Sequence, residues 1–188
     1  MISRMSHPVL MDHDHVPLYR VVREDCADPL DCSSSRRRLN DSRWNTPEFS
    51  ALYCCCSEWV ARAVTLDRLR LAGVELSDLQ PGVRPQLVEV EWKGRVVDAT
   101  SPDGVAAAGF DRDYPDGTRK EQTRRVATEW HATGAEGVVC RSAALQRRGS
   151  SHWSGAHQRW SEVAIFPDKA AVAPRVVRRR GDAAWLGG

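Results

Sequence analysis

The feature that most constrains the fold is a set of short apolar runs that do not alternate regularly with helical segments. Runs of this length, bounded by polar residues, are typical of buried or half-buried strands. Only two longer segments show helical spacing of apolar residues. Strands that outnumber helices without alternating favour a compact α+β domain, with a mixed sheet and a few flanking helices. The expected strands are 17–24, 50–57, the two halves of 86–100 on either side of Lys93-Gly94, 137–142, 160–166 and 170–177, and the expected helices are 58–72 and 119–133.

The best-defined local structure is a strand that runs directly into a helix. The run at 50–57 contains three consecutive cysteines and ends at Ser57, which suits a helix N-cap. Glu58 follows in the first turn, where a negative charge is favourable, and Gly73 is a natural helix stop. Residues 86–100 alternate on both sides of a Lys-Gly pair, which predicts a β-hairpin.

The chain of 188 residues is most simply one domain, and its net charge of +2 gives no argument for nucleic acid or membrane binding. The N-terminal stretch has no apolar run that would suit a signal peptide or a membrane span, so we expect a cytoplasmic protein. Adjacent cysteines are a poor disulfide framework, because neighbouring strand residues point to opposite faces. The expected organisation is a flexible leader at 1–16, a domain at 17–177 and a mobile basic tail at 178–188.

Four short motifs occur in an informative order along the chain. Tyr19-Arg20 comes first, Arg43-Trp44-Asn45 and Leu52-Tyr53 follow, and Cys140-Arg141-Ser142-Ala143 closes the strand at 137–142. This order resembles the RES domain family, whose members are similar to ADP-ribosyltransferases and include many toxins of toxin–antitoxin pairs that consume NAD⁺. The resemblance spans residues 18 to 166 and is most specific in the Arg-Trp-Asn…Leu-Tyr spacing. It implies an ADP-ribosyltransferase-like RES fold.

The resemblance also implies a reaction. The chain would bind NAD⁺ as substrate and degrade it by phosphorolysis or hydrolysis, or transfer ADP-ribose to a target. Cleavage of the bond between nicotinamide and ribose develops positive charge on the sugar, which polar or negative groups must stabilise. A cognate antitoxin is the implied protein partner, and no metal is expected.

The motifs supply candidate residues for this chemistry. Arg43 is the first anchor for phosphate or ribose and Arg20 the second, because the planar guanidinium binds phosphate oxygens in pairs. Tyr53 is expected to form a stacking wall, and Ser142 to present a hydroxyl to a ribose or phosphate oxygen. Asn45 is grouped with the cofactor-binding residues, although we expect it mainly to shape the loop.

The family's glutamate is missing from its expected place. It lies on the helix eleven residues after the tyrosine, and that position is Val64 in this sequence. Asp67 is three residues further along the helix, on roughly the same face, which makes it the possible substitute acid. Its alternative interpretation is a solvated surface charge.

Two other classes of function stay open. Because of Val64, the chain could be a RES-fold nucleotide-binding or protein-interaction module without catalysis. The second class is cysteine chemistry, for which Cys56 is the best candidate because it precedes the helix cap. Small apolar packing in a buried strand is the expected interpretation of the cysteine triplet.

Overall fold

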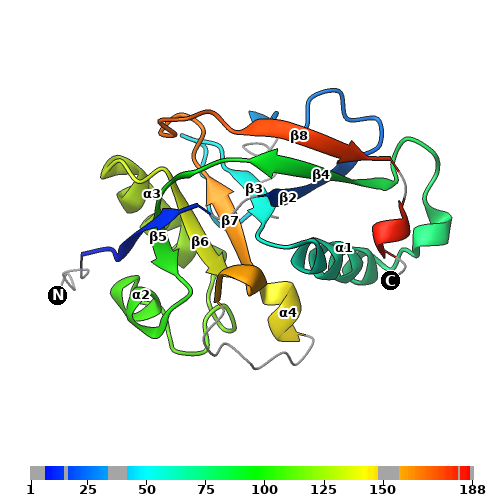
Figure 1. The fold of residues 1–188 in the computed structure, drawn as a ribbon. Helices are drawn as coiled ribbons and strands as arrows, with labels where there is room; N and C mark the ends of the chain where they lie inside the picture. Colours follow the sequence, from blue (N-terminus) through cyan, green and yellow to red (C-terminus); the bar gives the residue numbers. More distant parts are fainter. Residues whose placement is uncertain (1–6, 15–16, 34–41, 148–156, 182, 187–188) are drawn as a thin grey trace.

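The computed structural model describes residues 7–14, 17–33, 42–147, 157–181 and 183–186. Within these ranges the strands form one sheet in the order β1-β5-β6-β7-β3-β2-β4-β8 (Figure 1). The β5–β6 pair is parallel and the other neighbouring pairs are antiparallel, so the sheet is mixed. The predicted α+β class is confirmed. The strands are β1 (Leu10–His13), β2 (Leu18–Arg23), β3 (Leu52–Cys55), β4 (Pro85–Glu91), β5 (Gly94–Ala99), β6 (Gly137–Arg141), β7 (Ser161–Ile165) and β8 (Arg175–Arg180).

The predicted strand-to-helix segment forms as expected. The Ser57 hydroxyl accepts a hydrogen bond from the Val60 amide at 3.3 Å, and Gly73 ends α1 with a left-handed φ of 65°. No helix in the described ranges has both the length and the apolar character that crossing a membrane requires. The α-helices are α1 (Glu58–Ala72), α2 (Pro102–Ala107), α3 (Lys120–Ala132) and α4 (Ala143–Arg147), and short 3-10 helices occupy Leu76–Asp78, His157–Trp160 and Ala183–Leu186.

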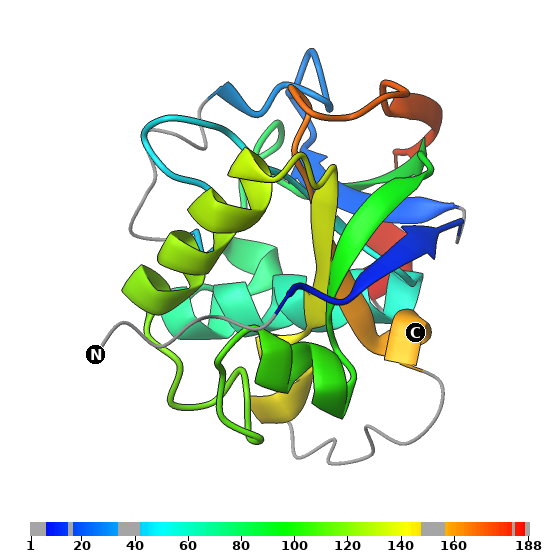
Figure 2. The ribbon, with the colours of Figure 1, turned by 90° about the vertical axis from the view of Figure 1, so that its left-hand side faces the viewer.

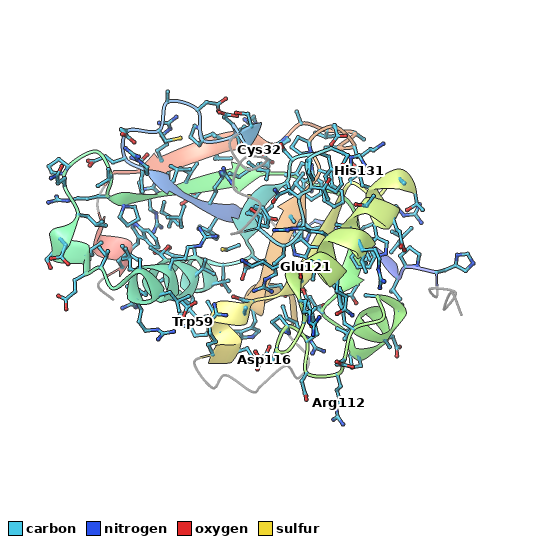
Figure 3. All side chains as sticks on the ribbon, turned by 180° about the vertical axis from the view of Figure 1, so that it is seen from behind. Cys32, Trp59, Arg112, Asp116, Glu121 and His131 are labelled. Carbon is cyan, nitrogen blue, oxygen red and sulfur yellow. The ribbon has the colours of Figure 1, made fainter. Side chains whose placement is uncertain are left out.

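Two helices cover different parts of the same sheet face. Side chains of α3 pack against β5, β6 and β7, and side chains of α1 pack against β2, β3 and β4. Figure 2 shows α3 lying along the β6 side of the sheet, with α1 behind it. In Figure 3, Trp59 marks the start of α1, whereas Glu121 and His131 mark opposite ends of α3. Trp44 and Phe49, from the segment before β3, pack with the α3 region of this face.

Residues 85–99 do not form the predicted hairpin. The sheet places β6, β7, β3 and β2 between β5 and β4, and the ladder directions make β4 and β5 run in the same sense. Only Trp92 and Lys93 connect them, so the sheet must curl enough to bring the end of β4 near the start of β5. A Cβ on Gly94 would lie 2.3 Å from the Trp92 ring. Gly94 is thus required by the packed tryptophan and not by a reversing turn.

Both predicted termini of the domain need correction. The predicted flexible leader contains β1, which pairs with β5 and buries His13 to 1% exposure. In the predicted mobile tail, residues 178–180 complete β8, and Trp185 and Leu186 are buried against α1 and Leu87. Polar and charged residues hid these elements, because β1 and β8 lie at the two edges of the sheet, where exposed side chains are tolerated. The rest of the leader and tail lies partly outside the described residues.

Candidate functional site

The hydroxyl of Tyr53 joins two of the motifs. It accepts a hydrogen bond from the Trp44 amide at 2.8 Å and donates one to Asn45 Oδ1 at 2.9 Å. Burial raises the pKa of Tyr53, and this outweighs the opposing effect of the Trp44 amide, so the hydroxyl keeps the proton that it donates. The loop that carries Arg43 is therefore fixed to β3. This bond network explains why an Arg-Trp-Asn triplet and a Leu-Tyr strand occur together.

The other side of the same loop is fixed to α3. Trp44 is 1% exposed and stacks on Trp130 with ring centroids 5.8 Å apart. The Thr123 hydroxyl donates to the Arg43 carbonyl at 2.9 Å. With β3 on one side and α3 on the other, the backbone of residues 43–45 is held at both ends. This fixed backbone limits where the Arg43 side chain can reach.

The guanidinium of Arg43 is partly buried among groups from several elements. Burial alone would lower its pKa, but Tyr114, Glu162 and Cys140 together outweigh that effect and the pKa is raised. The charge of Arg43 also acts on Tyr53. The structure thus brings Arg43 and Tyr53 together with groups on β6, on β7 and on the loop before α3. Arg43 stays fully charged in this setting, as an anion anchor requires.

Glu162 is the residue of this group that the sequence analysis missed. It lies on β7, paired in register with Cys55 on β3 and with Cys140 on β6. Alternation along β3 and β7 places its side chain on the same sheet face as Tyr53. The signal was present in the sequence: Ala164, two residues further on, indicates that this face of the strand is covered.

Arg141 is the last residue of β6, and the structure gives it a positioning role. Its side chain donates to the carbonyls of Thr100 at 2.8 Å, Arg112 at 2.9 Å and Tyr114 at 3.1 Å. These bonds fix the loop between α2 and α3 to the end of β6. Tyr114, fully buried, is thereby held beside Arg43 and Cys140.

Ser142 directly follows β6, two residues beyond Cys140. Its side chain is 0% exposed, and its hydroxyl has no hydrogen-bond partner among the described residues. A buried hydroxyl without a partner is unfavourable, so such a group in a native structure calls for an explanation. Ser142 lies two residues from Cys140, whose thiol interacts electrostatically with Arg43 and Glu162, and among the described residues its hydroxyl makes no hydrogen bond to the cluster.

Arg20 is not brought to this cluster. Its side chain donates to the carbonyls of Pro29 at 2.6 Å and Tyr53 at 3.0 Å, and its charge acts on Cys54 and Cys32. Cys54 belongs to the core on the opposite face of the sheet from the Tyr53 side chain. Arg20 therefore contacts the backbone of β3 from the sheet face opposite the Tyr53 side chain. Its predicted role as a second anchor has no geometric support, and we assign it the positioning of β3.

The carboxylate of Asp67 is used by an ion pair between helices. The side chain is 4% exposed and contacts Arg70 at 3.2 Å and Arg147 of α4 at Nε at 3.1 Å. Because two arginines occupy its oxygens, we do not assign it the role of substitute acid. Val64 lies one turn before Asp67 on the same side of α1. That side of α1 packs toward α4, and Val64 belongs to the same packed region as Leu145 of α4.

The Asp67 ion pair predicts a specific pH dependence of stability. Burial would raise the pKa of Asp67, but hydrogen bonds from Arg147 and Arg70 outweigh it and lower the pKa. A lowered pKa gives stability that is present above the unfolded value of about 3.9 and is lost as pH falls through the folded value. We expect Asp67→Asn to cost about 1–3 kcal/mol at pH 7 and progressively less below about pH 4, measured by urea unfolding across pH. A difference in unfolding free energy between the wild type and Asp67→Asn that grew as the pH fell would contradict this prediction.

The cysteines of the strand are buried in the core. Burial raises the pKa of Cys54 to about 11 and also raises that of Cys56, whose helix-start position was expected to favour a thiolate. A thiol with a raised pKa is a poor nucleophile near neutral pH. The six cysteines are free and no disulfide joins them. Packing is thus the role that the structure supports for the triplet.

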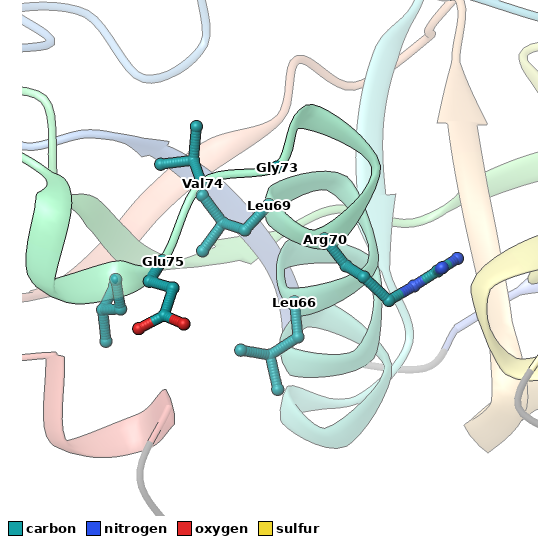
Figure 4. A pocket seen from close by; sticks show the side chains of 7 residues that line it. Leu66, Leu69, Arg70, Gly73, Val74 and Glu75 are labelled. Atoms are coloured by element: carbon teal, nitrogen blue, oxygen red, sulfur yellow. The ribbon is translucent and has the colours of Figure 1, made fainter.

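A groove lies apart from the Arg43 cluster. Figure 4 shows it at the C-terminal end of α1, and its lining residues include none of the cluster. The groove is lined by Leu66, Leu69, Arg70, Gly73, Val74, Glu75 and Leu76.

In the described part of the chain, no group of three or more histidine, cysteine or acidic side chains is arranged to hold a metal ion.

Comparisons with known proteins agree with this architecture. No match was found among curated proteins. The chain is similar to a solved structure described as the M. tuberculosis MbcT–MbcA toxin–antitoxin complex, with 17% identity and a TM-score of 0.67. That match covers 87% of this chain and 82% of the other, and at this identity it shows a shared fold. The RES domain family model matches residues 17–185, which is most of the sequence. The chain therefore belongs to the RES domain family.

Proposed function

We propose that this RES domain binds NAD⁺ and breaks the bond between nicotinamide and ribose. The observation that carries the proposal is the locked loop at residues 43–45. Tyr53 holds it through two hydrogen bonds, and it presents a charged Arg43 to Tyr114, Cys140 and Glu162. A guanidinium held in this way suits the pyrophosphate of a dinucleotide. The Ser142 hydroxyl, which has no hydrogen-bond partner within the described part of the chain, suits a ribose or phosphate oxygen.

The chemistry divides between binding and charge stabilisation. Nicotinamide leaves as a neutral base with the electron pair of the glycosidic bond, and the ribose C1′ gains positive charge. An oxygen of water, of inorganic phosphate or of a target side chain then bonds to C1′, and any proton on that oxygen passes to solvent. Arg43 would fix the cofactor in a reactive pose by holding its phosphates, which is where much of the rate gain arises.

A direct assay tests this function. The purified protein is incubated with NAD⁺, with and without inorganic phosphate, and the products are separated by liquid chromatography with mass detection. We expect nicotinamide release that equals NAD⁺ loss, and the partner product identifies hydrolysis or phosphorolysis. Labelled NAD⁺ with cell lysate reports transfer. Intact NAD⁺ in both buffers, with no labelled protein in lysate, would overturn the proposal.

A second candidate is a nucleotide-binding module without turnover, favoured by Val64 at the position of the family's acid. Calorimetry together with the NAD⁺ assay separates the module from the enzyme, because a module would bind NAD⁺ and release no nicotinamide.

We also propose an antitoxin partner. It is supported by the family and by the solved toxin–antitoxin complex whose fold this chain shares.

A further inference from the structure

The cleavage chemistry needs a negative group near the sugar, and the expected helix position is occupied by Val64. Several other carboxylates near the helices or on the sheet already have strong partners. An acid held by arginine or by several hydroxyl donors has little capacity left to stabilise a substrate cation. The occupied carboxylates are Asp67 with Arg70 and Arg147, Glu58 and Glu89 with Arg180, Glu91 with Arg175, and Asp98 with Thr100 and Ser101.

Glu162 differs from these acids in its position. It lies on β7 between β6 and β3, and it is directly paired with Cys140 and with Cys55. Side chains directly opposite each other on antiparallel strands have Cβ atoms about 4.5–5.5 Å apart. Its carboxylate therefore projects from the middle of the sheet on the face that carries the Tyr53 side chain. Its exposure is intermediate, so the residue is not sealed in the core.

Glu162 also differs in its partners. Among the described residues its carboxylate takes part in no hydrogen bond and in no ion pair within 4 Å. Its charge nevertheless acts on Arg43, on Tyr53 and on Cys140, so it shares their surroundings. A phosphate anchor and a carboxylate without a hydrogen-bond partner among the described residues thus lie close enough for their charges to interact. That is the pair of charges that a dinucleotide needs when its sugar becomes cationic.

We propose that Glu162 is the catalytic carboxylate of this chain and that it stabilises the developing positive charge on the ribose. The inference rests on the proposed NAD⁺ cleavage and names its acid. The acid enters from β7 instead of from α1, and it takes over the function of the missing glutamate at position 64. Val64 packs against a core cluster that includes Cys55, and Glu162 is paired in register with that same cysteine and with Cys140.

The test compares Glu162→Gln with the wild-type protein in the NAD⁺ assay. The amide keeps the shape and removes the charge, so we expect kcat to fall by about 100- to 1,000-fold with KM changed by less than about threefold. Glu91→Gln is the matched control, because Glu91 is also a half-buried strand glutamate but pairs with Arg175 near the edge of the sheet. It should keep the wild-type kcat. Thermal unfolding of each variant establishes that the fold is retained.

A second variant separates catalysis from structure. Val64→Glu in the Glu162→Gln background returns a carboxylate from the helix side, and we expect it to recover kcat at least tenfold over Glu162→Gln. No recovery in the folded double variant would overturn the shared position of the two acids. An active wild type whose Glu162→Gln variant is equally fast would overturn the role of Glu162 and leave the proposed function standing. A wild type that leaves NAD⁺ intact would overturn both.

Discussion

Replacing Arg43 with alanine is expected to lower kcat/KM for NAD⁺ by about 100-fold or more. The loop that carries Arg43 is held by the Tyr53 hydroxyl and by Thr123, so its position is set before substrate arrives. Removing one partner of a partly buried charge pair costs about 2–5 kcal/mol, because the substrate phosphate is left without its counter-charge. The measurement is steady-state nicotinamide release at several NAD⁺ concentrations, with circular dichroism to establish folding.

Two companion variants make the Arg43 result specific. Arg43→Lys keeps the positive charge but loses the planar fork, so its kcat/KM should fall between wild type and Arg43→Ala. Arg125→Ala removes an exposed arginine from α3 and should leave the rate unchanged. A folded Arg43→Ala protein with wild-type kcat/KM would show that phosphate is held elsewhere.

Replacing Trp44 with alanine is expected to lower the free energy of unfolding more than Asp67→Asn or Trp59→Ala does. The indole is 1% exposed and packs on Trp130 and Phe110, with centroids 5.8 Å and 6.3 Å away. Truncating a buried aromatic side chain costs about 3–5 kcal/mol, because packing is lost and a cavity remains. Urea unfolding followed by far-ultraviolet circular dichroism measures this loss without relying on tryptophan fluorescence.

Trp59 provides the matched control for Trp44. It is 44% exposed and contacts Trp160 edge to face at 4.5 Å, so Trp59→Ala should change stability by about 1 kcal/mol. If Trp44→Ala lowered the unfolding midpoint no more than Trp59→Ala, the loop at 43–45 would not depend on its buried ring. That result would also weaken the argument that Arg43 is preorganised.

Local chemistry in the sequence was sufficient for α1. Its cap at Ser57 and its stop at Gly73 act over a few residues, so they can be read from the chain directly. The order of β4 and β5 could not be predicted in the same way. Gly94 looks like a turn residue, and only the packed Trp92 ring shows why glycine is needed there.

In the candidate site, too, the sequence predicts the residues that lie close together along the chain and not those that distant strands contribute. Trp44, Asn45 and Tyr53 lie close together in sequence, and the structure joins them by hydrogen bonds that fix the loop carrying Arg43. Glu162 comes from a strand more than a hundred residues later, and the sheet register alone places it beside them. Asp67 was a reasonable candidate from helical spacing, but spacing could not show that Arg147 would reach it.

The central position of β7 has a consequence for how the protein is made. Residues 161–165 separate β3 from β6 and pair with both, so those two strands lack these partners until residue 165 has been synthesised. A nascent chain that ends before residue 161 carries Arg43 and Tyr53 but has two unpaired sheet edges and no Glu162. Ribosome-bound intermediates and truncated products would then be prone to aggregate and unable to consume NAD⁺. Insertion of β7 between β3 and β6 and completion of the proposed active site are therefore the same event.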